Sequence, residues 1–180
     1  MRAAVVSILL LAGLGAGVWW AMYEHDQRYD GKILTIARQY GLPPGLVKAV
    51  VWKESAFNAG VRGKHDEIGL MQLQPTSAQE WADARNNPHF QPEHLLDAET
   101  NLHAGCFYLS KLVRRYPKTD NPWVYALADY NAGRGNVLRW MKGPAETNSA
   151  AFLDAMTFPT TRAYVQRILS RYPLYAARLD

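Results

Sequence analysis

The sequence has a single cysteine and lacks the patterns of most metal and cofactor sites. Cys106 excludes an internal disulfide framework and a cysteine zinc site, and its place among Leu102, Leu109 and Val113 favours a small core residue. The five histidines form no His-Glu-x-x-His motif and no i,i+4 pair on a helix, and nothing resembles a phosphate-binding loop. We therefore expect no metal and no cofactor.

The chain also lacks repeats, low-complexity segments and long Gly/Ser linkers, which indicates one domain with an appendage. Its net charge of +4 suits an anionic polymer or a membrane surface but excludes little. The short basic stretch LVRRYPK favours a solvated helix end over a nucleic-acid site, so we expect no nucleic-acid partner.

Between Arg2 and Glu24 the sequence contains no charged residue. As a helix, Ala3–Tyr23 would span about 30 Å, enough to cross a bilayer. A cleaved export signal is the alternative, but cleavage after Gly17 would leave a mature end that begins with Val18 and two tryptophans. An uncleaved anchor is favoured, and the charges at its two ends favour export of the remainder.

Strand signals are weak in the rest of the chain, whereas helical patterns are frequent. The expected helices are Ile33–Tyr40, a helix that starts at the prolines before Gly45 and runs to about Ala56, a long helix capped by Asp97 that runs through Arg115, Pro122–Gly133, shorter helices near Val137–Met141 and Phe152–Met156, and a last helix that ends at Pro173. At most a small hairpin is expected in Val61–Ile68, inside a long loop (58–74) of a length that is often functional. The fold class is mainly α, with an anchor (1–23), a tether (24–32) and one domain (33–180).

Glu54 stands where the helical pattern predicts a hydrophobic residue. It follows Leu46 and Val50 at i+8 and i+4, so it continues an apolar stripe. An acid that keeps its proton near neutral pH needs apolar surroundings of this kind. Glu54 is therefore the candidate general acid, with a solvent-exposed helix end as the alternative.

Three short motifs occur in order: Glu54-Ser55, then Gly-Leu-Met-Gln from Gly69, then Tyr-Asn-Ala-Gly from Tyr130. Together they resemble the soluble lytic transglycosylase family, lysozyme-like enzymes that cut bacterial peptidoglycan. The stretches NLHAGCFYLSKLVRRY and TTRAYVQRIL also resemble helices of that family. The resemblance covers roughly residues 33–172, so it implies a lysozyme-like (goose-type) catalytic domain.

The resemblance implies cleavage of the β-1,4 bond between N-acetylmuramic acid and N-acetylglucosamine, with 1,6-anhydro-muramoyl ends as products. A single glutamate, Glu54, would act first as acid and then as base, because the substrate's N-acetyl group replaces the second carboxylate of ordinary glycosidases. It also implies substrate-binding roles for Ser55, Gln72, Met71, Tyr130, Asn131 and Tyr164.

The sequence departs from the family pattern at several positions. Gly63 stands where many members have a serine, Thr160 stands where many have a glutamate, and Asp66-Glu67 replaces a Gly-Ala pair. Asp129 replaces an alanine before Tyr130. Asp66 and Glu67 lie in a polar loop, where solvated charges are expected. These departures leave a true lysozyme-like hydrolase and a non-catalytic peptidoglycan-binding assembly factor as alternatives.

The expected location follows from the anchor and the resemblance together. A single-pass inner-membrane protein would hold its catalytic domain in the periplasm, and a cleaved signal would leave a periplasmic protein. The expected partners are peptidoglycan glycan strands and the inner membrane, with envelope or secretion machinery as the candidate recruiting partner. The expected state is a monomer.

Overall fold

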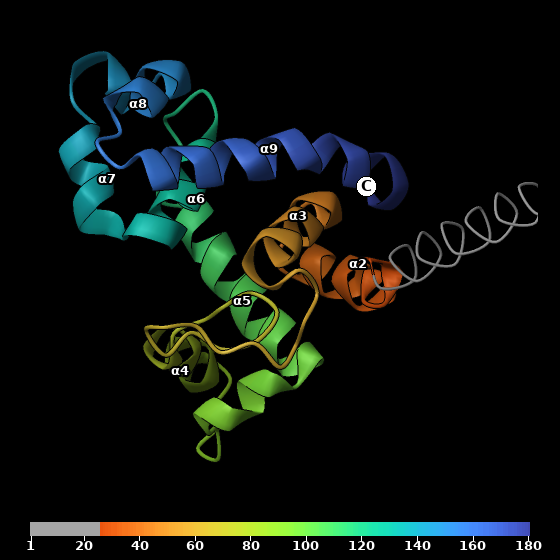
Figure 1. Cartoon of the computed structure of the whole chain (residues 1–180). Coiled ribbons are helices and arrows are strands. Elements are labelled where there is room, and N and C mark those ends of the chain that lie inside the picture. Colours follow the sequence, from red (N-terminus) through yellow and green to blue (C-terminus); the bar gives the residue numbers. More distant parts are fainter. Residues whose placement is uncertain (1–25) are drawn as a thin grey trace, which may run out of the picture.

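Residues 26–180 are described by the computed structural model, and this part of the chain is built from helices and loops (Figure 1). In chain order the elements are α2 (Asp30–Gln39), α3 (Pro44–Ser55), α4 (Pro75–Ala84), the 3-10 turn η1 (Pro92–Leu96), α5 (Ala98–Val113), α6 (Pro122–Ala132), α7 (Arg134–Trp140), the 3-10 turn η2 (Gly143–Glu146), α8 (Ser149–Ala155) and α9 (Pro159–Leu179). Within these residues the β contacts are isolated antiparallel bridges, Arg62–Ile68 and Ile68–Leu73. The prediction of a mainly helical fold is confirmed.

The helices are arranged around α5, which runs through the middle of the molecule (Figure 1). α5 packs against α2, α4 and α6, while α9 lies across α3 and α6. The long loop between α3 and α4 lies beside α5, close to the end of α3. The chain thus brings the end of α3, this loop and the end of α6 to one side of α5.

The first two turns of α3 are buried on every face and not along one stripe, while Trp52, Lys53 and Glu54 of the last turn are partly exposed. Leu46, Val47, Ala49, Val50 and Val51 are all fully buried. Its main partner is α9, and the two backbones approach closely at one glycine: a Cβ atom on Gly45 would lie 2.5 Å from the backbone nitrogen of Ala176. A central helix enclosed in this way has little freedom to move, so it holds its last turn in place.

The first part of α3 also carries a fully buried lysine. Lys48 Nζ lies 2.6 Å from Asp30 Oδ1 and 3.6 Å from Asp26 Oδ2, and 4.7 Å from the centre of the Tyr175 ring. Asp26 in turn accepts a hydrogen bond from the Tyr175 hydroxyl at 2.9 Å. The buried ammonium is therefore compensated by groups from both ends of the described chain, as a buried charge requires.

Two predicted helix boundaries have different outcomes. Asp97 caps α5 as predicted, because its Oδ1 accepts from the Thr100 backbone N–H at 2.8 Å. The predicted stop at Pro173 is wrong, since α9 continues through this proline to Leu179. A proline removes one backbone hydrogen bond, but the buried Tyr175 lies beyond it and packs edge-on against Phe57, so tertiary contacts outweigh the local cost.

No helix among residues 26–180 is both long enough and apolar enough to cross a membrane. The predicted anchor, 1–23, lies outside the described residues.

Candidate active site

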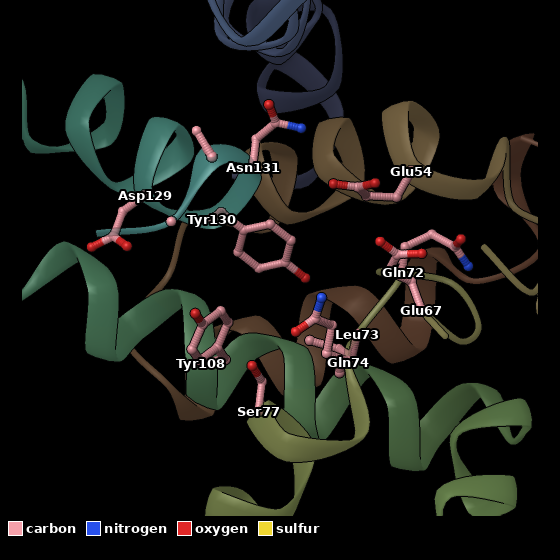
Figure 2. Close-up of a pocket in the computed structure, with 12 residues that line it drawn as sticks. Glu54, Glu67, Gln72, Leu73, Gln74, Ser77, Tyr108, Asp129, Tyr130 and Asn131 are labelled. Carbon is pink, nitrogen blue, oxygen red and sulfur yellow. The ribbon is translucent and has the colours of Figure 1, made fainter. Parts of the chain in front are cut away.

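A cavity of about 500 Å³ opens where the end of α3, the loop after it, the start of α4, the middle of α5 and the end of α6 meet (Figure 2). Four residues named from the sequence line it: Glu54, Gln72, Tyr130 and Asn131. The three motifs are far apart in the chain, yet each contributes to this one cavity.

Glu54 lies in the last turn of α3, just before the chain turns away. Ala56 and Phe57 have positive φ angles of 47° and 64°, so the helix ends immediately after Ser55. The Tyr164 hydroxyl, from α9, donates a hydrogen bond to Glu54 Oε1 at 2.5 Å. The carboxyl group is thus held at the helix end and directed along the cavity wall (Figure 2).

Burial raises the pKa of Glu54 from 4.5 to about 7. The hydrogen bond from Tyr164 and the positive charge of Lys53 act in the opposite direction, because both stabilise the ionised carboxylate, and the nearby Glu67 adds to the increase. A carboxyl group with a pKa near neutrality can donate a proton and later accept one, which is the property of a general acid–base catalyst.

The Gly-Leu-Met-Gln segment is fixed to α5 by one buried asparagine. Asn101 Oδ1 accepts from the Met71 backbone N–H at 2.8 Å, and its Nδ2 donates to the carbonyls of Ile68 (2.8 Å) and Leu95 (2.9 Å). Gly69 has a φ of +78°, and a Cβ there would lie 2.3 Å from both Asn101 Nδ2 and the Leu95 carbonyl oxygen. The glycine of this motif is therefore required by close packing and by its backbone conformation.

Gln72 and Tyr130 also hold the loop between α3 and α4 in place. Gln72 Nε2 donates to the carbonyls of Val61 and Gly69, at 3.1 and 2.9 Å. The Tyr130 hydroxyl donates to the Met71 carbonyl at 2.7 Å, which joins α6 to the loop. Figure 2 shows the Tyr130 ring extending into the space between α5 and α6.

Asn131 lies at the end of α6 and joins this helix to α9. Its Oδ1 accepts from the Thr161 hydroxyl at 2.8 Å. α6 ends one residue later, and Gly133 follows with a φ of +79°. The wall of the cavity is thus fixed at the junction of α6 and α9.

Three residues named from the sequence have side chains that do not line the cavity. Ser55 is buried and donates to the Val51 carbonyl at 3.1 Å within α3. Met71 is fully buried, with its sulfur against Gly105 of α5. Tyr164 does not line the cavity, but its hydroxyl contacts Glu54 from α9.

Asp129 lines the cavity, but its carboxylate is engaged in an ion pair and a hydrogen bond. Its Oδ2 lies 2.9 Å from Arg115 Nη1 and accepts a hydrogen bond from the Tyr116 hydroxyl at 2.6 Å. The Asp129 side chain is only 1% exposed. Figure 2 shows it pointing away from Glu54. Asp129 therefore holds α6 to the end of α5 and is not a second acid for chemistry.

Sequence reasoning missed several lining residues: Glu67, Leu73, Gln74, Ser77 and Tyr108. Glu67 lies in a polar loop where the sequence predicts solvated charges, and nothing in the sequence indicates that its side chain turns inward. Tyr108 has no motif signal in the sequence; its ring centre lies 5.5 Å from that of Tyr130. Among the described residues, no group of three or more His, Cys, Asp or Glu side chains could hold a metal ion.

Known proteins of one family are similar to this chain in sequence and in fold. A model of the transglycosylase SLT domain family matches residues 32–153. The chain is 33% identical over 131 residues to the soluble lytic murein transglycosylase of Escherichia coli, an alignment that covers 72% of this chain and 20% of that protein. It is 32% identical over 162 residues to the membrane-bound lytic murein transglycosylase C of Sodalis glossinidius, which covers 86% of this chain and 44% of that protein.

The fold is similar to that of an inactive glutamate-to-glutamine mutant of lytic transglycosylase Slt from Pseudomonas aeruginosa. The TM-score is 0.77 at 29% identity, over 85% of this chain and 24% of that one. The chain thus spans about a fifth of the length of the soluble relatives and less than half of the membrane-bound one.

Proposed function

The chain belongs to the transglycosylase SLT domain family, and from this membership we propose that residues 33–180 form a peptidoglycan lytic transglycosylase. The substrate would be the β-1,4 bond between N-acetylmuramic acid and N-acetylglucosamine. The observation that carries this proposal is Glu54, a carboxyl with a pKa near 7 in a cavity to which all three motifs contribute. The similar Pseudomonas structure is described as an inactive glutamate-to-glutamine mutant, which agrees with a reaction that depends on one glutamate.

In the proposed reaction Glu54 first donates its proton to the glycosidic oxygen. The sugar's own N-acetyl group stabilises the anomeric carbon as the bond breaks. The Glu54 carboxylate then removes a proton from the muramoyl 6-hydroxyl, whose oxygen attacks that carbon and closes the 1,6-anhydro ring. The proton that Glu54 gives to the departing sugar is replaced by the one it takes from the 6-hydroxyl, so the acid is regenerated and no water or cofactor is consumed.

The product decides between this reaction and hydrolysis on the same fold. Digestion of purified peptidoglycan sacculi by the full chain, followed by mass spectrometry of the released fragments, is expected to show anhydro-muramoyl ends. Reducing ends would instead show that water attacks. Glu67 gives the hydrolase alternative some support, because it is a second carboxylate that lines the cavity.

A non-catalytic wall-binding role is the third alternative. It would be favoured by a wild-type protein that sediments with sacculi but releases no fragments. Its sequence support came from Gly63 and Thr160, and neither residue carries the proton transfer that we assign to Glu54.

We also propose that residues 1–23 anchor the domain in the inner membrane, with the domain in the periplasm. Relatives include proteins named as soluble and as membrane-bound. Asp26 and Asp30 contact Lys48 and Tyr175, so the segment that follows this anchor is attached directly to the domain. Recovery of the full chain in the membrane fraction after a high-salt wash is expected, and recovery in the soluble fraction would contradict an anchor.

Tyr164→Phe is expected to shift the pH dependence of cleavage upward and to lower its rate by about tenfold. The variant loses the hydrogen bond that stabilises the ionised Glu54, so the pKa of this carboxyl should rise above about 7. The high-pH limit of activity, where the acid loses its proton, should therefore move to higher pH. A pH–rate profile of wild type and variant measures this shift, and Tyr172→Phe, at an exposed bond to Asp180, serves as the control.

A further inference from the structure

Glu67 occupies the space that the glycine at residue 63 leaves open. A Cβ on Gly63 would lie 2.1 Å from Glu67 Oε2 and 3.0 Å from Gln72 Oε1. A serine at residue 63 could not coexist with this position of the Glu67 side chain. Gly63 and Glu67, which both depart from the family pattern, therefore form a single arrangement. The carboxylate of residue 67 occupies the space that a side chain of residue 63 would take.

The Glu67 carboxylate is held in place and still has a free face. Oε2 accepts from the His65 backbone N–H at 3.0 Å, and the Gly63 N–H donates to the Glu67 carbonyl at 2.7 Å. In the part of the chain that the structure describes, Oε1 accepts no hydrogen bond and lies 3.6 Å from His65 Nδ1. The side chain is 26% exposed and lines the cavity together with Glu54 and Gln72 (Figure 2).

We propose that Glu67 is a substrate-contacting residue whose carboxylate accepts a hydrogen bond from an N–H or O–H of the sugar bound beside Glu54. This inference rests on the proposed function, since it assigns an amino sugar to the cavity. Such sugars present amide and hydroxyl donors, and an anchored carboxylate is a stronger acceptor than a serine hydroxyl. The contact would orient the sugar ring relative to the Glu54 proton.

Glu67→Ala is expected to lower kcat/KM about tenfold to a hundredfold, the loss expected for a hydrogen bond to a charged group. Glu67→Gln should lose about tenfold although it can still accept from the His65 N–H, because its charge and its free acceptor are gone. A role confined to holding the loop would leave Glu67→Gln unimpaired. The matched control is Asp66→Asn, an exposed neighbour at a positive φ that asparagine tolerates.

Gly63→Ser provides the reciprocal test. Alone it should impair cleavage, because its side chain displaces the Glu67 carboxylate. In the Glu67→Ala background it should restore part of the activity, since the 2.1 Å conflict with Glu67 Oε2 is gone and only 3.0 Å contacts with the residue 67 Cβ and Gln72 Oε1 remain. If the double variant is no better than Glu67→Ala alone, the two residues do not share one place and the proposal is overturned.

A pH profile adds an independent readout. Glu54 is faced by Lys53 from its own helix, Tyr164 from α9, Tyr130 from α6 and Glu67 from the loop. Loss of the Glu67 charge removes a like-charge neighbour, so the pKa of Glu54 should fall and the high-pH limit of cleavage should move to lower pH in Glu67→Gln. The shift should be small, because burial, the Tyr164 hydrogen bond and Lys53 all affect this pKa more than Glu67 does, and a move of the limit to higher pH would contradict a carboxylate facing Glu54.

Binding separates this proposal from the proposed function. Glu54→Gln and Glu54→Gln/Glu67→Ala are compared for affinity to purified, uncrosslinked glycan strands. A roughly tenfold weaker binding of the double variant supports the Glu67 contact even if the wild type cleaves nothing, in which case only the proposed activity fails. Equal binding, or a Glu67→Ala enzyme within twofold of wild type, overturns the contact and leaves the activity of Glu54 untouched.

Discussion

Replacement of Glu54 by glutamine is expected to reduce glycan cleavage by about a thousandfold or more and, at the same time, to stabilise the folded domain above pH 7. The amide has nearly the same shape and can still accept the hydrogen bond from Tyr164 at Oε1. It cannot supply or take up the proton. The same substitution therefore removes the chemistry and preserves the packing.

The gain in stability follows from the cost of ionising Glu54 in the fold. Its pKa is about 7 in the folded protein against 4.5 as the ordinary value, a difference worth about 3 kcal/mol. Below pH 4.5 the group is protonated in both states and costs nothing. As pH rises from 4.5 to 7, Glu54 ionises in the unfolded chain before it ionises in the folded protein. The folded wild type therefore loses stability, up to about 3 kcal/mol above pH 7.

Denaturant unfolding of wild type and Glu54→Gln at pH 4.5 and pH 8 measures this difference. The two proteins should be nearly equally stable at the lower pH and should differ by about 2–3 kcal/mol at the higher one. Glu93→Gln, at an exposed carboxylate, is the control and should change neither activity nor stability. A stability difference that does not depend on pH would contradict the raised pKa, and retained activity would contradict the assignment of the acid.

Asn101→Ala is expected to destabilise the domain by about 3–5 kcal/mol and to abolish most cleavage, although Asn101 does not line the cavity. The substitution leaves two buried backbone groups without partners, the Met71 N–H and the Leu95 carbonyl. It also removes one of the two hydrogen bonds to the Ile68 carbonyl, which still accepts from the Leu73 N–H. The Met71 carbonyl also holds the Tyr130 hydroxyl, so the loosened loop would carry Gln72 and Tyr130 away from Glu54.

Two measurements test this role of Asn101. Denaturant unfolding gives the loss of stability, and hydrogen exchange should show that the Met71 amide loses its protection. The control is Asn148→Ala, which removes one exposed helix-cap bond to Ala151 and should cost about 1 kcal/mol. If Asn101→Ala costs no more than this control, the loop is held by other contacts.

The helical framework could be predicted from local patterns, because cap residues and prolines act on their own helix. Asp97 caps α5 through a contact three residues away, which the sequence shows directly. The continuation of α9 past Pro173 could not be predicted, since it depends on tertiary contacts of Tyr175 with Phe57 and Asp26. Sequence rules for helix ends fail where the stabilisation from tertiary contacts is larger than the cost of a proline within the helix, about 3 kcal/mol.

The candidate site likewise contains residues that the sequence predicts and one that it does not. The motifs containing Glu54, Gln72 and Tyr130 could be found from their order, and the structure brings them to one cavity. The position of Glu67 could not be found, because the loop changes direction at three residues with positive φ: Asp66, Gly69 and Gln72. In a loop of this kind the alternation of the sequence does not indicate which charge turns inward.

α3 has a consequence for where this domain can act. The contacts of Lys48 with Asp26 and Tyr175 fix the point at which the chain enters the domain, and Glu54 lies in the last turn of the same helix. Glu54 follows Lys48 by six positions along the helix, a rise of about 9 Å. Because α3 is buried from its start to Val51, the distance between the attachment of the chain and the Glu54 carboxyl is fixed. On a chain held at its N-terminal side, the reach of the acid would be set by this rigid spacing.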